Sequence, residues 1–162
     1  MVTARKPKRR RKEAKTDYRK RMILLKADKP RIVIRRTNKY FIVQLVESSE
    51  AQDKVVKTLS SKVLLNHGWS KDSVGSLKSV PAGYLTGKIF AKELGDTECI
   101  IDLGMVKTIF GNRAFAVVKG LVDGGAKISA NKKVFPSEER IKGEHLKDDM
   151  KAMISKVEAS LK

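Results

Sequence analysis

The N-terminal segment of this chain cannot contribute to a hydrophobic core. Residues 5–21 read RKPKRRRKEAKTDYRKR, in which eleven of seventeen positions are Lys or Arg and two, Glu13 and Asp17, are acidic. Side chains of this kind stay in water or pair with an anion. The folded body must therefore be built from the rest of the chain. The segment itself is expected to meet a polyphosphate, which in a soluble protein usually means nucleic acid.

The positive charge is concentrated in this N-terminal segment, residues 5–21, which we call the arm, but it continues beyond the arm. Residues 1–40 hold seventeen Lys/Arg against three Asp/Glu, a net charge of +14, and the other 122 residues hold nineteen against fifteen, a net charge of +4. The cations continue into structured sequence at Arg31, Arg35, Arg36 and Lys39. A solvated tail or a targeting address would not need cations there, so the pattern favours nucleic-acid binding.

Length and composition indicate one globular domain with extensions. The chain has 162 residues, of which 41% are hydrophobic and 6% aromatic. The low aromatic share argues against a surface built mainly on base stacking. A single cysteine, Cys99, excludes an intrachain disulfide and suits a reducing, cytoplasmic home. No apolar run approaches a signal peptide or a membrane span, so we expect a soluble, unexported protein without a membrane partner.

The first half of the body is predicted to be mostly strands. Residues 18–27 favour a short helix, which Lys29 and Pro30 end. Residues 31–36 and 40–46 are rich in β-branched and aromatic side chains around a short turn, the signature of a β-hairpin. The second of these strands is apolar on both faces, so we expect it to lie centrally with cover on each side. Residues 54–59 are a third candidate strand.

The second half is predicted to be mostly helices. Pro81 suits a first helical position, and the remaining segments are a helix over 82–94, a strand over 99–103, a helix over 113–122, a helix start at 136–139 and an amphipathic helix over 147–161. The last helix carries a Met-rich stripe, for which packing on the body is the default and docking on a protein partner the alternative.

Together these segments predict an α/β fold. The expected architecture is a mixed sheet that begins with an antiparallel hairpin and is backed by helices, with a basic N-terminal extension and a C-terminal amphipathic helix. We divide the chain into a basic RNA-binding extension (1–28), a central α/β domain (29–128), and an irregular segment with the C-terminal helix (129–162).

A catalytic site finds little support in the sequence. Asp102 ends an apolar strand, and Asp123 and Glu144 could join it around Mg²⁺ as in a nuclease. No paired-acid motif accompanies them, and an Asp that caps a turn at a strand end is much commoner. Cys99 lies in an apolar run typical of a buried, inert thiol, and a single Cys with two His cannot complete a zinc site. We predict no catalytic residue, no metal, no cofactor and no small-molecule substrate.

A glycine-rich segment at residues 83–88, GYLTGK, resembles a phosphate-binding loop only superficially. Three residues separate its glycines instead of four, and Ile89 stands where Ser or Thr would bind magnesium. The segment is predicted to be helical, with small residues that let the helix lie close to the sheet. We therefore predict no nucleotide site.

Two further residues have alternative interpretations. Tyr18, which is surrounded by Lys and Arg, would suit stacking on an unpaired base or packing of its ring on the body. Asn38 at the hairpin turn would suit contact with RNA, although turn chemistry alone explains its presence.

Several segments in order resemble a known family. They lie at residues 9–13, 16–18, 29–31, 37–39, 82–87, 102–104, 115–125 and 140–145. No single stretch is specific, but together they span most of the chain. The sequence is similar to the archaeal and eukaryotic branch of large-subunit ribosomal protein eighteen, the family that binds 5S rRNA. Members of this branch often continue well past the last of these segments, whereas here only one helix follows.

The resemblance implies a structural role in the large ribosomal subunit. It implies that the partners are 5S rRNA, the large-subunit rRNA and neighbouring ribosomal proteins, and that the place is the central protuberance of the cytoplasmic ribosome. An RNA-processing, metal-dependent nuclease with a similar body is the competing class. Carried over to this chain, the resemblance implies RNA contacts in the arm and the hairpin at Arg5, Lys6, Lys8, Arg9, Arg10, Arg11, Lys12, Lys15, Tyr18, Arg19, Lys20, Arg21, Arg31, Arg35, Arg36, Thr37, Asn38 and Lys39.

Overall fold

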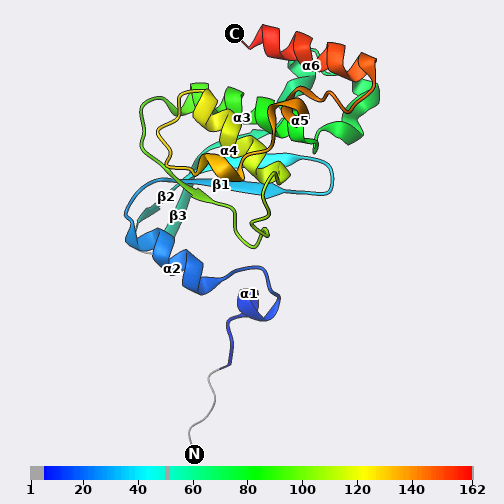
Figure 1. The fold of residues 1–162 in the computed structure, drawn as a ribbon. Helices are drawn as coiled ribbons and strands as arrows, with labels where there is room; N and C mark the ends of the chain where they lie inside the picture. Colours follow the sequence, from blue (N-terminus) through cyan, green and yellow to red (C-terminus); the bar gives the residue numbers. More distant parts are fainter. Residues whose placement is uncertain (1–5, 50–51, 162) are drawn as a thin grey trace, which may run out of the picture.

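A computed structural model describes residues 6–49 and 52–161, and it has two layers and an arm (Figure 1). A four-stranded sheet has the strand order β3-β2-β1-β4. Two helices, α3 (Val80–Leu94) and α4 (Arg113–Asp123), cover one face of the sheet. The N-terminal arm lies below the other face, and the C-terminal helix lies at the opposite end of the molecule (Figure 1). The predicted α/β class with a helix-backed mixed sheet is confirmed.

The predicted hairpin forms the centre of the sheet. Strands β1 (Arg31–Arg36) and β2 (Phe41–Ser49) pair antiparallel, in a register that places Arg31 opposite Val46 and Arg36 opposite Phe41. The Thr37 hydroxyl accepts from the backbone N–H of Tyr40 at 2.9 Å and thereby holds the turn. Strand β3 (Gln52–Ser60) pairs antiparallel with β2, and the short β4 (Ile100–Asp102) pairs parallel with β1. Strand β2 is therefore internal, as predicted.

The two faces of the hairpin have different surroundings. Ile32, Ile34, Phe41, Val43 and Leu45 point into the main core under α3 and α4. The alternate residues on the other face line a cleft of about 940 Å³ between the sheet and the arm. Strand β2 was expected to be covered on both faces. The face toward α3 and α4 is buried, whereas the other face borders the cleft.

Glycines allow α3 and α4 to touch through their backbones. A Cβ atom on Gly87 would lie 2.3 Å from the carbonyl oxygen of Val117, and one on Gly120 would lie 2.0 Å from that of Tyr84. The small residues of α3 were expected to bring the helix close to the sheet, but Gly87 faces α4. Residues 83–88 lie inside α3, so the segment is helical as predicted and is not a phosphate-binding loop.

A second core joins the C-terminal helix to the body. Helix α6 (Asp148–Ser160) buries Met153, Ile154 and Val157 against a cluster that includes Leu64 and Trp69. Packing of the Met stripe on the body, the default expectation, is confirmed. The remaining elements around this core are the 3₁₀ helices η1 (Ser61–His67) and η2 (Lys71–Ser76) and the short helix α5 (Glu138–Lys142).

The remaining short elements lie in the arm and beside α4. They are α1 (Arg9–Lys12), α2 (Tyr18–Lys26) and the 3₁₀ helix η3 (Lys132–Val134). Of α1, α2 and η2, only α2 was predicted from sequence patterns; α1 and η2 form in stretches for which no helix was predicted. Among the helices of the described residues, none has the length and apolar character needed to cross a bilayer.

Candidate nucleic-acid interface

The arm presents its cations on two short helices. Asp17 caps α2 by accepting hydrogen bonds from the backbone N–H groups of Arg19 and Lys20 at 3.0 and 3.2 Å. The side chain of Arg10 donates to the Thr16 hydroxyl at 2.8 Å, which ties α1 to the start of α2. Every residue of α1 is exposed. The arm is therefore locally shaped, and its charge faces outward.

The position of Tyr18 is compatible with both interpretations of this residue, stacking on an unpaired base and packing on the body. The ammonium group of Lys8 is 4.7 Å from the centroid of its ring, within the range of a cation–π contact. The residue is half-buried and lines the cleft between the arm and the sheet. Its ring is thus partly covered, and it is neither buried in the core nor fully free.

Five charged side chains form a continuous ion-pair network across the cleft face of the sheet. Asp53 on β3 accepts from Arg21 of α2 at 2.8 Å and from Arg31 of β1 at 2.7 Å. Arg31 also lies 3.5 Å from the carboxylate of Asp102, which is 3.2 Å from Arg35. We call these five residues the arginine network. It ties the arm to the sheet through Arg21 and ties β3 to β4 through Arg31.

The network changes the pKa of one of its carboxyl groups. Burial acts to raise the pKa of Asp53, but this is outweighed by hydrogen bonds from Ser48 and Arg21 and by the charges of Arg31 and Arg21. The net result is a pKa below the ordinary value of 3.8. Asp53 is therefore held as a carboxylate by its partners, as expected for a structural ion pair.

The structure places most of the predicted RNA contacts on the surface. Arg5 lies outside the described residues. The exposed members are Lys6, Lys8, Arg9, Arg10, Arg11, Lys12, Lys15, Arg19, Lys20, Arg36, Thr37, Asn38 and Lys39. Tyr18 and the network residues Arg21 and Arg35 are half-buried. Arg31 is the exception, because its side chain is 2% exposed and its guanidinium is paired inside the network. The internal carboxylates Asp53 and Asp102 thus take the place of an external phosphate at Arg31.

The exposed cations form two groups rather than one. The arm joins the sheet at the start of β1, and residues 36–39 lie at its far end (Figure 1). Six residues at about 3.3 Å each separate the two ends by roughly 20 Å. The exposed cations therefore form an arm group on α1 and α2 and a hairpin group at residues 36–39, and β1 connects the end of the arm to the hairpin turn.

Asp53 has a role that the sequence patterns missed. It lies just before the predicted strand at residues 54–59, and no local signal distinguishes it from other surface acids. Its two arginine partners are 32 and 22 residues away in sequence. The β1–β2–β3 pairing brings Arg31 close to Asp53, and the position of α2 beside the sheet brings Arg21.

Asp102 and Asp123, two of the carboxylates considered for metal binding, are bonded to other groups of the protein. Asp102 accepts from the backbone N–H of Gly104 at 2.7 Å, in addition to its arginine pairs. Asp123 accepts from the hydroxyl of Tyr84 at 3.0 Å. Burial, followed by the charge of Glu98, raises the pKa of the Cys99 thiol, which keeps the thiol protonated. Across residues 6–49 and 52–161, no three His, Cys, Asp or Glu side chains are grouped as metal ligands.

Comparison with known proteins identifies the family. Residues 4–97 match the family model described as "Ribosomal large subunit proteins 60S L5, and 50S L18". The large ribosomal subunit protein uL18 of Korarchaeum cryptofilum is 43% identical over 141 residues, covering 85% of this chain and 70% of that protein. The uL18 protein of Methanoregula boonei is also 43% identical, with 85% and 79% covered, and that of Methanothrix thermoacetophila is 40% identical, with 88% and 83% covered. The chain belongs to the uL18 family of large-subunit ribosomal proteins.

Proposed function

We propose that this chain binds 5S rRNA and attaches it to the large-subunit rRNA in the central protuberance. The family assigns the coarser role: a structural constituent of the large subunit of the cytoplasmic ribosome, and not an enzyme. The proposal adds which RNA is bound and which surfaces bind it. Its further partners are the ribosomal proteins that flank this one in the subunit.

The observation that carries the proposal is the presence of two exposed basic groups, one on the helices of the arm and one at the hairpin turn. The arm offers a dense set of exposed cations, which suits contact with phosphates and makes affinity depend strongly on salt. The hairpin group offers Arg36, Asn38 and Lys39 in a turn held by Thr37. Because folded RNA is recognised by shape and by unpaired bases, a fixed pair of contact groups can select one fold of RNA over another.

The arginine network supports the same proposal by orienting the arm. Without a contact to the body, α2 would sample many directions, and the spacing between the two groups would vary. The contact between Arg21 and Asp53 couples α2 to β3, which pairs with β2 of the hairpin. The arm and the hairpin therefore approach an RNA as one surface.

The nuclease alternative is not supported. Of its three candidate carboxylates, Asp102 is paired with arginines, Asp123 accepts from a tyrosine hydroxyl, and Glu144 is exposed on the surface. The family is structural.

Chemical footprinting of 5S rRNA with the purified protein tests the proposal. Archaeal 5S rRNA is probed with and without protein, and a competitor RNA of equal length and unrelated sequence is present in excess. We expect a localised footprint that survives the competitor. Protection that is spread along the whole molecule, or that the competitor removes, would count against a 5S-specific role and leave only a general affinity for RNA.

A further inference from the structure

A loop outside the arm and the hairpin displays large apolar side chains to solvent. Residues 103–112 connect β4 to α4, and on this loop Ile109 is 62% exposed and Phe110 is 74% exposed. Phe110 is the most exposed of the large apolar residues described. Such exposure is costly in water unless a partner covers it.

The loop is held in place, so its exposed tip is not the result of fraying. The side-chain amide of Asn112 donates to the carbonyl oxygen of Lys107 at 3.0 Å, across the base of the tip. The backbone N–H of Gly111 donates to the carbonyl oxygen of Val134 at 3.0 Å, which fixes the loop against η3. Gly111 has φ +69°, a conformation that glycine adopts without strain. Phe110 is thus presented on a braced turn.

The chain segment that carries this tip is rich in cations and poor in acids. From Leu103 to Ser137 the sequence holds six Lys/Arg and one acid, Asp123, which accepts from the Tyr84 hydroxyl. Lys119 and Lys127 pair with Glu138 and Asp96. The other four cations are exposed and make no ion pair with the described part of the chain. They are Lys107, Arg113, Lys132 and Lys133.

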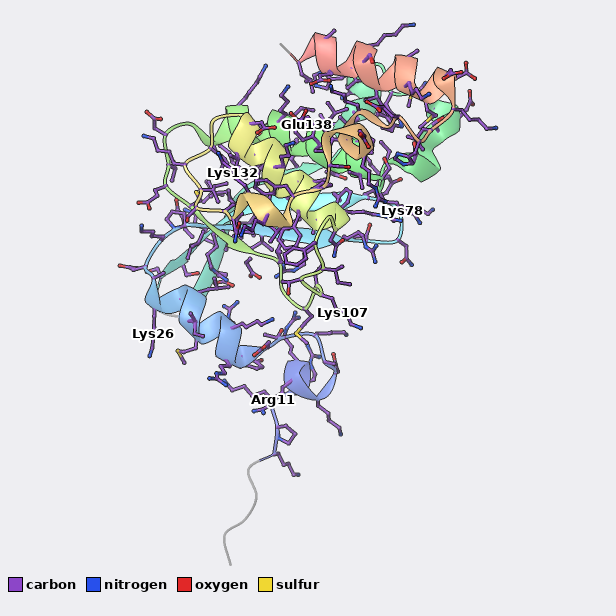
Figure 2. All side chains as sticks on the ribbon, in the orientation of Figure 1. Arg11, Lys26, Lys78, Lys107, Lys132 and Glu138 are labelled. Atoms are coloured by element: carbon purple, nitrogen blue, oxygen red, sulfur yellow. The ribbon has the colours of Figure 1, made fainter. Side chains whose placement is uncertain are left out.

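Topology brings these four cations to the loop. Lys107 is on the loop, Arg113 begins α4 directly after it, and Lys132 and Lys133 belong to η3, which the Gly111–Val134 hydrogen bond places alongside. Figure 2 shows Lys107 at the end of the molecule where Arg11 of the arm also lies. Residues 105, 106 and 108 of the loop line the same cleft as Arg10 and Tyr18 of the arm.

We propose that this loop is a second RNA-binding surface, in which Phe110 stacks on an unpaired base while Lys107, Arg113, Lys132 and Lys133 contact phosphates. The inference rests on the proposed function and adds a contact site to it. A flat apolar ring within a field of unpaired cations fits a polyanion that carries flat rings of its own, which is single-stranded nucleic acid. A protein partner would have to combine an apolar pocket with a strongly acidic rim. The bases of a regular duplex are already stacked, so the ligand is a loop, bulge or end of an rRNA.

A tryptophan probe at the tip tests stacking directly. In the Phe110→Trp variant the only other tryptophan is Trp69, which is buried and donates from its indole N–H to Ser76, so wild-type protein supplies the background signal. The full-length variant is titrated separately with archaeal 5S rRNA and with large-subunit rRNA. We expect quenching of the new tryptophan at the concentration where RNA binds. The RNA that produces the quenching identifies the source of the base.

Matched substitutions separate stacking from general apolar contact. Phe110→Ala is expected to weaken binding of that RNA about tenfold, and Phe110→Leu by a similar factor, because neither side chain has a ring. Phe110→Tyr should bind as wild type does. Ile109→Ala, an exposed apolar control on the same loop, should change affinity by less than about twofold. Both sites are on the surface, and thermal unfolding checks that each of the four variants folds.

The outcomes are distinguishable from failure of the proposed function. If wild-type protein binds neither RNA, both proposals are lost. If wild-type protein binds but Phe110→Ala binds equally well and Phe110→Trp is not quenched by either RNA, the 5S proposal survives and the stacking site is refuted. Equal binding by Phe110→Leu and wild type would also refute stacking, since it would show that any apolar side chain suffices.

Discussion

The arginines of the arm and the arginines of β1 look alike in the sequence and behave differently in the fold. Arg9, Arg10 and Arg11 are exposed on a single helical turn, where their only protein partners are the nearby exposed Glu13, 3.8 Å from Arg9, and Thr16, which accepts from Arg10, among the residues that the structure describes. Arg31 is buried between two carboxylates, and Arg35 is 42% exposed beside one of them. The first group is available to an external anion, while the second already has its anions inside the protein. Local charge density alone therefore does not define an interface, because the neighbours across the sheet decide which cations remain free.

The largest expected effect is a loss of stability on removing the buried arginine, Arg31. Arg31→Met should lower the free energy of unfolding by about 3 kcal/mol, because two carboxylates lose a partner at a site shielded from water. Urea unfolding monitored by circular dichroism measures this change. Arg19→Met on the exposed face of α2 is the matched control and should lie within about 0.5 kcal/mol of wild type. Equal midpoints for the two variants would mean that the network adds no stability.

The reverse experiment neutralises the exposed group. The triple variant Arg9→Gln, Arg10→Gln, Arg11→Gln should keep its stability and lower the slope of log affinity against log salt by about 2 to 3, because each lost phosphate contact removes roughly 0.7 to 0.9. Binding of 5S rRNA over a range of salt concentrations supplies the slope. Lys142→Gln, Lys147→Gln, Lys156→Gln neutralises three exposed cations near the C-terminal end and should leave the slope unchanged. A similar loss in both triples would indicate net charge rather than a defined arm contact.

The hairpin group should affect choice of RNA more than strength of binding. Arg36→Gln with Lys39→Gln should lower the salt slope by about 1.5, from two lost contacts. It should also reduce the ratio of affinities for 5S rRNA and an unrelated RNA of equal length, whereas the arm triple should leave that ratio nearly intact. Competition binding with both RNAs measures the ratio. An arm triple that loses selectivity while the hairpin variant keeps it would reverse the two roles.

The smallest effect is a pH dependence of stability that belongs to the network and not to the arm. The pKa of Asp53 is lower in the folded protein than its ordinary value of 3.8, so the carboxylate stabilises the fold above that value. This contribution is lost as the pH falls through the lower, folded pKa. Asp53→Asn should therefore be less stable than wild type at pH 7, and the difference should shrink below about pH 4.

Asp28→Asn is the control for that measurement. Asp28 is exposed beyond the end of α2 at φ +47°, a conformation that Asn tolerates as well as Asp does. Its difference from wild type should not follow the same pH curve. If Asp53→Asn remained equally destabilised at pH 3 and pH 7, the contribution of Asp53 would come from shape rather than from charge.

The elements with strong local patterns were predictable, and the irregular ones were not. Strand β1 follows from a run of β-branched residues bounded by Pro30 and a turn, and α3 from its apolar period and Pro81. The 3₁₀ helix η2 lies in a stretch of Ser, Lys and Gly whose sequence is typical of a loop. It was not predictable, because its packing around Trp69 involves α6, which is about 80 residues away in sequence. The boundaries of the strands moved by a few residues for the same reason, since strand length depends on the partner strand.

The candidate interface was predicted as a set of cations but not as a surface. Charge density predicted RNA contacts in the arm and at the hairpin turn, and residues 6–12 and 36–39 are exposed in the structure; their contact with RNA stays a prediction. The loop with Phe110, which contains no acid, was not predicted as a contact surface. The net charge of the body is small because acids elsewhere in the body offset the cations near this loop. Its braced tip depends on Val134 of another element.

The sequence by itself determined the family, the separation of a basic arm from an apolar body, and the order of strands and helices. These depend on local composition and on periodicity along the chain, which are present before the chain folds. Tertiary structure alone decided that Gly87 and Gly120 serve helix–helix contact, that Arg31 is internal, and that Phe110 is displayed among unpaired cations. Each of these depends on residues distant in sequence becoming neighbours, because burial and charge pairing are properties of the neighbours that surround a side chain in space.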